Sequence, residues 1–470
     1  MMRINRCGHE LGTNRMPMGE DAEQRFSDLW PGYLWLEGKT PLHLREDQER
    51  PVHMPRGPAK RTGPGFVNPA MAPARTRSVL MLSDALSHEW LVDSEHPIRA
   101  MDALCSTGIR FRRWRTEIEQ HHQQRLRIHA NDMDQFALLW AQSTMKEHPP
   151  QSSWTYDETL FNDHQRVHGT NIDGIFYMSE DARIALHRGA YQWIDLDPFG
   201  SPITFLDAAI QGLGRKGVLE VTATDTAALT GSSPSPQRRR YGSSGIVDAY
   251  AHDDAIRTLI GVVATTAAKH DRYVRPILAL FDGHHVRVSV LVIRSKEGAS
   301  DTHSSIGWRV RKDNGGYVFV HHPQPEELPQ SSGPLWIGAL WNHEITKRMT
   351  EERALELCYP NEDERELLIT NGLEWDDKDW EYARREICRS VRHIHDASTL
   401  LSTSHSLVHV DAFAKHIGLS QIPRMEHIFS EFNTNGFRIA RVPDVDPMFA
   451  TDASFEECSH ILKSMDVSHK

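Results

Sequence analysis

The stretch Trp193–Pro202, with the sequence WIDLDPFGSP, decides the fold of this chain. Its first four residues are mostly apolar and suit a buried strand, and the prolines and glycine that follow favour a turn. Such a strand is typical of a parallel α/β sheet, where ligands bind beyond the carboxyl ends of the strands. Asp197 follows the strand directly. The sequence therefore predicts that its carboxylate lies at the ligand-binding edge.

Short apolar stretches alternate with helical stretches between residues 61 and 297, as expected for a parallel sheet. Five strands are predicted, at Ile98–Leu104, Leu126–Asp132, Gly174–Met178, Gln192–Leu196 and Gly217–Thr224. A helix is expected at Val247–Lys269. Beyond it, Pro276–Phe281 and Val286–Ile293 flank an Asp-Gly turn and are expected to form a hairpin. Five alternating units closed by a hairpin resemble the sheet of class I methyltransferases, in which the last strand runs antiparallel.

Acidic residues lie at or near the carboxyl ends of four of the predicted strands: Asp102, Asp132, Asp181 and Asp197. An acid after the second strand typically bonds a ribose hydroxyl pair, and Asp181 is placed to bond an adenine amine. A helix N-cap is the alternative role for Asp132 and Asp181. The loop after the first strand lacks the G-x-G-x-x-G pattern that brings backbone close to a pyrophosphate. This argues against a dehydrogenase, whereas a sulfonium cofactor has no phosphate and needs no such loop.

The tetrapeptide Asp197–Gly200 suits chemistry on a planar amine. The amine of guanine, adenine or cytosine is a poor nucleophile, because its lone pair is delocalised into the ring. The Asp197 carboxylate and the Pro198 carbonyl would each accept one amine hydrogen, orient the nitrogen and help remove its proton. Phe199 would stack on the base, and Asp195 would support the turn. Taken alone, Asp-Pro is also a common start of a turn.

The composition is that of a globular protein, with 470 residues, 39% hydrophobic and 25% charged. We find no apolar run that suits a bilayer span or a signal peptide, so no membrane partner is expected. The five cysteines are scattered without a C-x-x-C pair, which favours the reducing cytoplasm and argues against a thiolate metal site. Most of the 28 histidines are expected at the surface. A monomer is the favoured oligomeric state.

The net charge of −11 counts against non-specific binding along a nucleic acid. A basic face on an acidic protein is nevertheless compatible with RNA binding. Arginines alternate with aromatic residues in Arg110–Arg115 and gather beside Tyr241 in Arg238–Tyr241. Such clusters suit phosphate pairing and base stacking. The alternative for both is an ordinary exposed helix face or loop.

Three regions are expected: an N-terminal extension (1–60), the sheet domain (61–297) and a C-terminal α+β domain (298–470). Gly315-Gly316 and the Pro-rich stretch 323–334 favour a connection at the start of the last region. Beyond it, Gly436–Arg441 suits a strand of a winged-helix-like unit. Helices are predicted at Lys347–Leu357, Trp380–Ile394, His409–Ile417 and Ile422–Glu431.

Several ordered motifs resemble the tRNA (guanine-26 N2)-dimethyltransferase family. Asp197–Pro202 matches its D-P-F-G-S-P signature, and Asp102–Arg110 resembles its D-A-L-x-x-T-G-I-R loop. Phe66–Met71 resembles F-Y-N-P-x-M, with Val67 in place of the tyrosine. The remaining matches are Arg75, Asn131-Asp132, Asp181-Ala182, Glu220–Asp225, Arg239–Gly242 and Gly333–Gly338. The resemblance covers roughly residues 64 to 297 and continues more faintly to the C-terminus.

The resemblance implies S-adenosylmethionine-dependent methylation of the N2 amine of guanosine 26 in tRNA, giving N2-methyl- and N2,N2-dimethylguanosine. Asp197 would be the catalytic carboxylate. The implied cofactor-binding residues are Arg75, Arg110, Asp102, Asp132, Asp181 and Ala182. The implied substrate-binding residues are Phe66, Asn68, Pro198 and Phe199. Arg75 and Arg110 suit either the methionine carboxylate or RNA phosphate, and Phe66 equally suits the core.

Relatives often carry a cysteine zinc cluster before the G-P-L-W-x-G segment. Residues 297–340 contain no cysteine, so no structural metal is expected there. tRNA is the expected partner, and DNA is not. Two rival functions remain: another amino methyltransferase acting on DNA adenine or a protein side chain, or a catalytically silent RNA-binding module. Retention of Asp197 and the cofactor acids argues against the silent module, because binding alone requires neither.

Overall fold

A mostly parallel β-sheet organises the protein. The computed structural model describes residues 29, 32–45, 67–146, 170–172, 175–403, 405–445 and 447–467. The strands of this sheet are β3 (Ile98–Asp102), β4 (Leu126–Asn131), β5 (Thr170–Ile172), β6 (Ile175–Met178), β7 (Tyr191–Leu196), β8 (Leu213–Ala223), β9 (Arg272–Phe281) and β10 (Val286–Arg294). Their spatial order is β5-β6-β4-β3-β7-β8-β10-β9. Neighbouring strands from β6 to β8 pair in parallel, and β10 runs antiparallel to both β8 and β9.

The five predicted parallel strands and the closing hairpin are confirmed. Strand β8 is longer than predicted, because it begins at Leu213 directly after the preceding helix. Strand β7 has neighbours on both sides, and its residues are buried apart from half-buried Gln192. This burial explains why its sequence is almost continuously apolar. Asp102 and Asp195 are register partners in the adjacent strands β3 and β7.

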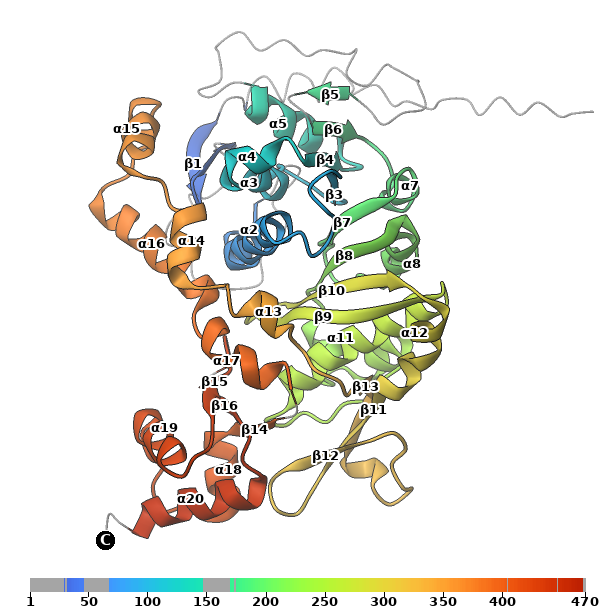
Figure 1. Ribbon diagram of the computed structural model, residues 1–470, viewed down its shortest axis with the longest axis vertical. Helices are drawn as coiled ribbons and strands as arrows, with labels where there is room; N and C mark the ends of the chain where they lie inside the picture. The colour runs from blue at the N-terminus through green and yellow to red at the C-terminus, as the bar shows by residue number, and fades with distance from the viewer. Residues whose placement is uncertain are drawn as a thin grey trace, which may run out of the picture.

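Helices cover both faces of the sheet (Figure 1). One side carries α2 (Ala72–Ser87), α3 (Ile109–Glu117) and α4 (Gln120–Gln123), and the other carries α7 (Ala182–His187), α8 (Ile203–Gly212) and α11 (Ala251–Ala268). The remaining helical segments of this region are η2 (Pro69–Met71), α5 (Gln135–Lys146), α9 (Thr226–Leu229), α10 (Pro234–Pro236), η3 (Gln237–Tyr241), α12 (Lys296–Asp301) and η4 (Thr302–Ser305). Trp114 and Trp193 are fully buried in the main hydrophobic core between these layers.

A β-hairpin lies within the segment expected as an N-terminal extension. It consists of β1 (Tyr33–Glu37) and β2 (Thr40–Leu44). Trp35, Leu42 and Leu44 form a small core with Val67 and Ile109, so the hairpin packs beside the start of α3. Glu37, the last residue of β1, is buried and pairs with Arg75 and Arg113 of the sheet domain.

A second, three-stranded sheet follows the main one, with the order β12-β11-β13. Its strands are β11 (Ile306–Arg311), β12 (Tyr317–Val320) and β13 (Ser331–Trp336), with η5 (Leu328–Gln330) before β13. The prediction of a connection through residues 323–334 is therefore wrong for its last four residues, which belong to β13. Pro334 had suggested a loop, but β13 is an edge strand, and proline is tolerated there. Gly315-Gly316 form the turn between β11 and β12, where the Lys312 amide donates to the Gly316 carbonyl.

The rest of the chain is mostly helical and runs along one side of the sheet domain to the end of the molecule (Figure 1). Its helices are α13 (His343–Thr346), α14 (Glu351–Cys358), α15 (Glu362–Thr370), α16 (Asp377–Val391), α17 (Ile394–Leu401), α18 (Val410–Ile417), α19 (Met425–Thr434) and α20 (Phe455–Val467). Helix α14 starts later than predicted, because the side chain of Thr350 caps it by accepting a hydrogen bond from the Arg353 amide.

The last part of the chain forms a unit with its own hydrophobic core. A sheet of β14 (Ser406–His409), β16 (Met448–Thr451) and β15 (Ile439–Arg441) packs with α18, α19 and α20. The predicted helical pair and the strand near Gly436–Arg441 are confirmed. Among the described residues, no helix combines the length and the apolar character that a membrane crossing requires.

Candidate active site

The carboxyl ends of β3, β4 and β7 bring Asp102, Asp132 and Asp197 to one edge of the sheet, as the sequence predicted. The loop after β3 is held against the end of β4. The amide of Ser106 donates to Oδ2 of Asp132 at 2.8 Å, and the amide of Cys105 donates to the Asn131 carbonyl at 2.8 Å. Oδ1 of Asp132 accepts from the Asp134 amide at 2.8 Å. Asp132 therefore organises two loops beside the expected cofactor position.

Gly108 allows this loop to turn into α3. Its φ is +78°, a backbone conformation that favours glycine, and an added Cβ would lie 2.4 Å from the ring of Phe111. Asn131 joins three loops, because its side-chain amide donates to the carbonyls of Ala103 and Glu180 at 3.1 Å and its oxygen accepts from the Glu180 amide. The D-A-L-x-x-T-G-I-R loop is thus fixed by contacts with the end of β4, as well as by its own hydrogen bond from the Gly108 amide to the Cys105 carbonyl at 2.7 Å.

Asp181 lies after β6 and is the N-cap of α7, which is the alternative role that the sequence left open. Its side chain accepts from the backbone amide of Arg183 at 2.9 Å and pairs with the Arg183 guanidinium at 2.6 Å. Hydrogen bonding by Arg183 lowers the pKa of Asp181 to about 2. Ala182 is buried in the first turn of α7.

Arg110 links the two acids of the WIDLDPFGSP turn. Its Nη2 donates to Oδ2 of Asp197 at 2.7 Å, and its Nε lies 3.0 Å from Oδ1 of Asp195. The side chain of Asp197 is 21% exposed, whereas that of Asp195 is fully buried. Asp197 is therefore the acid of this pair that a ligand at the sheet edge can reach.

Further buried charges continue behind Asp195. Arg287 of β10 donates to Asp195, and its Nη2 lies 3.1 Å from Oε1 of Glu220 in β8. Glu220 also accepts hydrogen bonds from Ser78 of α2 and Trp193 of β7. We call this row of five side chains, in the spatial order Glu220, Arg287, Asp195, Arg110 and Asp197, the charge series. Its charges alternate in sign, so each buried ion is paired.

The charge series determines which acids are ionised. Burial would raise the pKa of Asp197, but Arg110 and then Arg287 outweigh it and lower that pKa below its usual value. Burial raises the pKa of Asp195 in spite of both arginines. Burial, followed by the neighbouring charge of Asp195, also raises the pKa of Asp102. At this edge, Asp197 is thus ionised and accessible to a ligand. The buried acids Asp195 and Asp102 bind protons more readily.

Among the described residues, the polar atoms at this edge that are buried without a hydrogen-bond partner include Nη1 of Arg110 and Oδ2 of Asp102. A carboxylate would satisfy the first and an ammonium group the second. The amino-acid end of S-adenosylmethionine carries both groups. The residues present therefore fit this cofactor.

Arg75 is held by the N-terminal hairpin. It pairs with Glu37 and donates to the Asn68 carbonyl at 2.9 Å. Burial would raise the pKa of Glu37, but Arg75 and Arg113 lower it overall. Arg75 is thus engaged by a carboxylate of the protein, a contact that the sequence did not predict.

The predicted substrate-binding residues have different surroundings. Asn68 caps η2, because its Oδ1 accepts from the Ala70 amide at 3.0 Å. Pro198 is buried, and Phe199 is 62% exposed beside it. Phe66 lies outside the described residues.

The two basic clusters differ in their surroundings. In Arg110–Arg115, the expected basic face is wrong for Arg110, Arg112 and Arg113, which are at most 5% exposed. Arg113 instead pairs with Glu117 and Glu37. Arg238, Arg239 and Arg240 are exposed, as a basic surface requires.

Sequence reasoning missed Glu37, the role of Arg287, and His285. His285 is 2% exposed, and its Nε2 lies 3.9 Å from Oδ2 of Asp282. Burial lowers its pKa to about 4, so it is neutral near pH 7. A signal for Arg287 existed, because it interrupts the otherwise apolar start of a strand predicted to be buried. No comparable signal marked Glu37, whose surroundings have weak periodicity.

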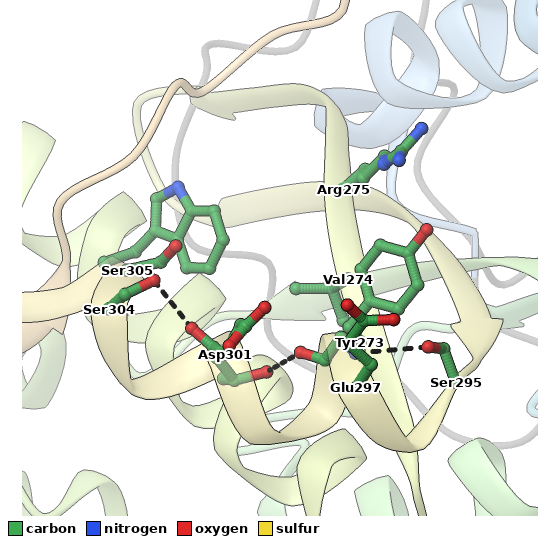
Figure 2. Close-up of a pocket in the computed structure, with 11 residues that line it drawn as sticks. Tyr273, Val274, Arg275, Ser295, Glu297, Asp301, Ser304 and Ser305 are labelled. Atoms are coloured by element: carbon green, nitrogen blue, oxygen red, sulfur yellow. Dashed lines mark hydrogen bonds between the residues drawn. The ribbon is translucent and has the colours of Figure 1, made fainter.

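A cavity of about 370 Å³ lies away from this edge, beside the amino end of β9 and helix α12. Tyr273, Arg275, Glu297 and Asp301 are among the residues that line it (Figure 2). None of the predicted site residues lines this cavity. Among the described residues, no group of three or more histidine, cysteine, aspartate or glutamate side chains is placed to hold a metal ion.

The sheet order, the antiparallel β10 and the acids at the carboxyl edge define a Rossmann-like, class I S-adenosylmethionine-dependent methyltransferase fold. The chain belongs to the N2,N2-dimethylguanosine tRNA methyltransferase family, whose model matches residues 48–463.

Curated relatives and a solved structure agree with this assignment. The chain is 31% identical over 308 residues to the tRNA (guanine(26)-N(2))-dimethyltransferase of Pyrococcus furiosus, covering 64% of this chain and 74% of the relative. It is 38% identical over 276 residues to the enzyme of the same name from Thermoplasma volcanium, covering 58% of this chain and 67% of the relative. Trm1 from Pyrococcus horikoshii, solved in complex with S-adenosyl-L-methionine, aligns with a TM-score of 0.68 at 22% identity. That alignment covers 91% of this chain and 99% of the other, and it supports the fold.

Proposed function

We propose that this protein transfers methyl groups from S-adenosylmethionine to the exocyclic N2 amine of guanosine 26 in tRNA, forming N2-methyl- and N2,N2-dimethylguanosine. The observation that carries the proposal is the Asp197 carboxylate, paired with Arg110 and reachable at the carboxyl edge of the sheet, in a chain that belongs to this family.

Asp197 acts on the amine as a hydrogen-bond acceptor and then as a proton acceptor. Its lowered pKa keeps it ionised at neutral pH, so it is ready to accept an amine hydrogen. The Pro198 carbonyl accepts the second hydrogen, and the two contacts orient the nitrogen lone pair. When bound, the cofactor supplies an electrophilic methyl group on a positively charged sulfur. As the nitrogen took this methyl group, the bonding pair would remain with sulfur, and Asp197 would take the proton that the nitrogen loses.

The second methylation places a stricter demand on the same acceptor. N2-methylguanosine retains a single N–H, so it can satisfy either Asp197 or the Pro198 carbonyl, but not both. Proton removal requires that this hydrogen points to Asp197. The pocket must also accept a methyl group where the first hydrogen was. A second cofactor molecule is used for this step.

The cofactor is held by residues at the ends of three strands, β3, β4 and β6, and by Arg110 of α3. Nη1 of Arg110 receives the methionine carboxylate, and Asp102 receives the methionine ammonium group. Asp132 bonds the ribose hydroxyl pair. Asp181 bonds the adenine amine, for which its contact with Arg183 must rearrange, and Ala182 lies beside the ring. Arg75 supports the site through Glu37 and Asn68.

The guanine base lies against exposed Phe199, and Asn68 lines another part of its pocket. The nucleoside must leave the stacked tRNA to reach Asp197, so the tRNA opens locally. Residues 298–470, the C-terminal domain, help hold the tRNA during this opening. We place the protein in the cytoplasm, because the cysteines within the described residues are free thiols, as in a reducing compartment. We propose a monomer.

The proposal is tested by methyl transfer to three substrates. Purified protein is incubated with labelled S-adenosylmethionine and unmodified tRNA, double-stranded DNA or a mixture of unfolded proteins, with the Asp197→Ala variant as a control. We expect label in tRNA with the wild type and none with the variant. Label in DNA or protein instead would assign a different amine substrate, and cofactor binding without any transfer would favour a silent binding module.

A further inference from the structure

Arg238 and Arg239 are distinct among the arginines beside the candidate site. Both are exposed, and within the described part of the chain neither side chain has an ion pair or a hydrogen bond. Their neighbour Arg240 is exposed too, but its Nη1 pairs with Oδ2 of Asp225 at 2.9 Å. Two guanidinium groups therefore remain available to a partner.

These arginines lie on the short helical turn η3 (Gln237–Tyr241), which hydrogen bonds fix at both ends. The side chain of Gln237 is buried, accepts from the Gly245 amide at 2.9 Å and donates to the Leu229 carbonyl at 3.3 Å. The turn ends at Gly242, which has a φ of +62° and donates to the Arg238 carbonyl at 3.1 Å. The backbone of Arg238 and Arg239 is thus fixed, while their side chains point away from the core.

Tyr241 joins this turn to the catalytic motif. It is 4% exposed, and its hydroxyl donates to Oδ1 of Asp225 and lies 3.0 Å from the Ser201 hydroxyl. Ser201 is two residues from Phe199. Gly200 and Thr224 also exchange hydrogen bonds, at 2.7 and 2.9 Å, across the ends of β7 and β8. The arginine-bearing turn and the motif that presents Asp197 and Phe199 therefore form one connected structure.

We propose that Arg238 and Arg239 form a phosphate clamp, which binds the RNA backbone next to the nucleotide that enters the site. The inference rests on the proposed function. An acidic chain with a net charge of −11 repels RNA at long range, so local unpaired arginines must provide the attraction. Guanidinium groups bind phosphate through paired hydrogen bonds. Because the turn is bonded to the catalytic motif, phosphate binding there fixes the displaced nucleotide relative to Asp197.

The test compares the Arg238→Ala/Arg239→Ala variant with wild type in binding to an unmodified tRNA transcript at several salt concentrations. We expect affinity to fall about tenfold at low salt, and the slope of log K against log salt to decrease by about two, one for each lost phosphate contact. The Arg238→Lys/Arg239→Lys variant keeps both charges and should retain most of the slope.

Arg215→Ala is the matched control. Arg215 is also exposed and, within the described residues, has no ion pair, but it lies near the amino end of β8. At about 3.3 Å per residue, it is about 26 Å from the carboxyl end of that strand. Its removal should leave affinity and slope unchanged. S-adenosylmethionine affinity and thermal unfolding should match wild type in all variants.

An unchanged salt slope in the double alanine variant overturns the clamp, as does an equal loss in Arg215→Ala. Weaker binding with an unchanged slope also overturns it, because the defect is then not phosphate contact. Methyl transfer by the wild type is measured separately, so the two proposals fail separately. Loss of slope in the alanine variant would support the clamp even if the wild type methylated no tRNA, a result that would contradict the proposed function.

Discussion

Arg110 donates a hydrogen bond from Nη2 to Oδ2 of Asp197 at 2.7 Å. A positive charge is thereby fixed against the carboxylate that we propose as the proton acceptor. The same guanidinium contacts Asp195, and Arg287 holds Asp195 from the other side. Asp197 is therefore kept ionised and oriented by buried neighbours, so it can accept an amine hydrogen without first losing a proton itself.

Replacing Asp197 with Asn keeps the shape of the side chain and removes its charge. We expect methyl transfer to fall by about 10²- to 10⁴-fold, because an amide does not accept the amine proton. Affinity for S-adenosylmethionine, measured by calorimetry, should change little, because we propose that Asp197 contacts the substrate amine and not the cofactor. Near-normal turnover would contradict the assigned role.

Replacing Arg287 with Met removes one arginine partner of Asp195. Asp195 then competes with Asp197 for Arg110. Since Arg287 helps to lower the pKa of Asp197, its loss raises that pKa. The reaction needs the ionised form, so the acidic limb of the kcat–pH profile should move to higher pH. Misplacement of Asp197 should also lower kcat about 10- to 100-fold.

A second substitution separates this effect from simple unfolding. Asp195→Asn combined with Arg287→Met removes both charges of one pair and leaves Arg110 to Asp197 alone. The double variant should recover part of the activity, and its acidic limb should shift back to lower pH. If the two substitutions only add their losses, the charge series does not position Asp197.

Replacing Asp132 with Ala should weaken cofactor binding before it affects the chemical step. A hydrogen bond to a charged group contributes about 1.5–3 kcal/mol, which corresponds to roughly 10- to 100-fold in affinity. Equilibrium binding of S-adenosylmethionine measures this directly. Unchanged affinity together with a lower melting temperature would show that Asp132 serves only its contacts with Ser106 and Asp134.

Arg77 connects the sheet domain to helix α16 of the C-terminal region. It is buried in α2, pairs with Asp282 at 2.5 Å and donates to the Ser390 carbonyl at 3.1 Å. Arg77→Met removes the buried ion pair with Asp282, so we expect a loss of about 3–5 kcal/mol in the free energy of unfolding by urea. Arg348→Ala is the control. It breaks the more exposed pair with Asp84 and should cost at most about 1 kcal/mol.

The strands and the acids at the sheet edge were predictable because they depend on local signals. Apolar strands such as β7 and the acid that follows each of them are visible along the sequence. The partners of those acids were not predictable, because they come from distant segments. Glu37 reaches Arg75 from the N-terminal hairpin, and Arg287 reaches Asp195 from β10.

The basic cluster in α3 shows a second kind of failure. Its arginines suggested a surface, but burial was possible because Glu37, Glu117 and Asp195 supply charges from three elements. A charged residue next to an aromatic one does not reveal whether a carboxylate from elsewhere will cover it. The proline in β13 misled for a related reason, since its tolerance depends on the position of the strand in the sheet.

The identity of the methylated nucleoside tests the central claim most directly. Purified protein is given labelled S-adenosylmethionine and tRNA transcripts that carry either guanosine or adenosine at position 26, and the digested nucleosides are separated and identified. We predict label in N2-methyl- and N2,N2-dimethylguanosine from the guanosine transcript and none from the adenosine transcript. Label that persists after the base change, or that appears in another nucleoside, would contradict the account.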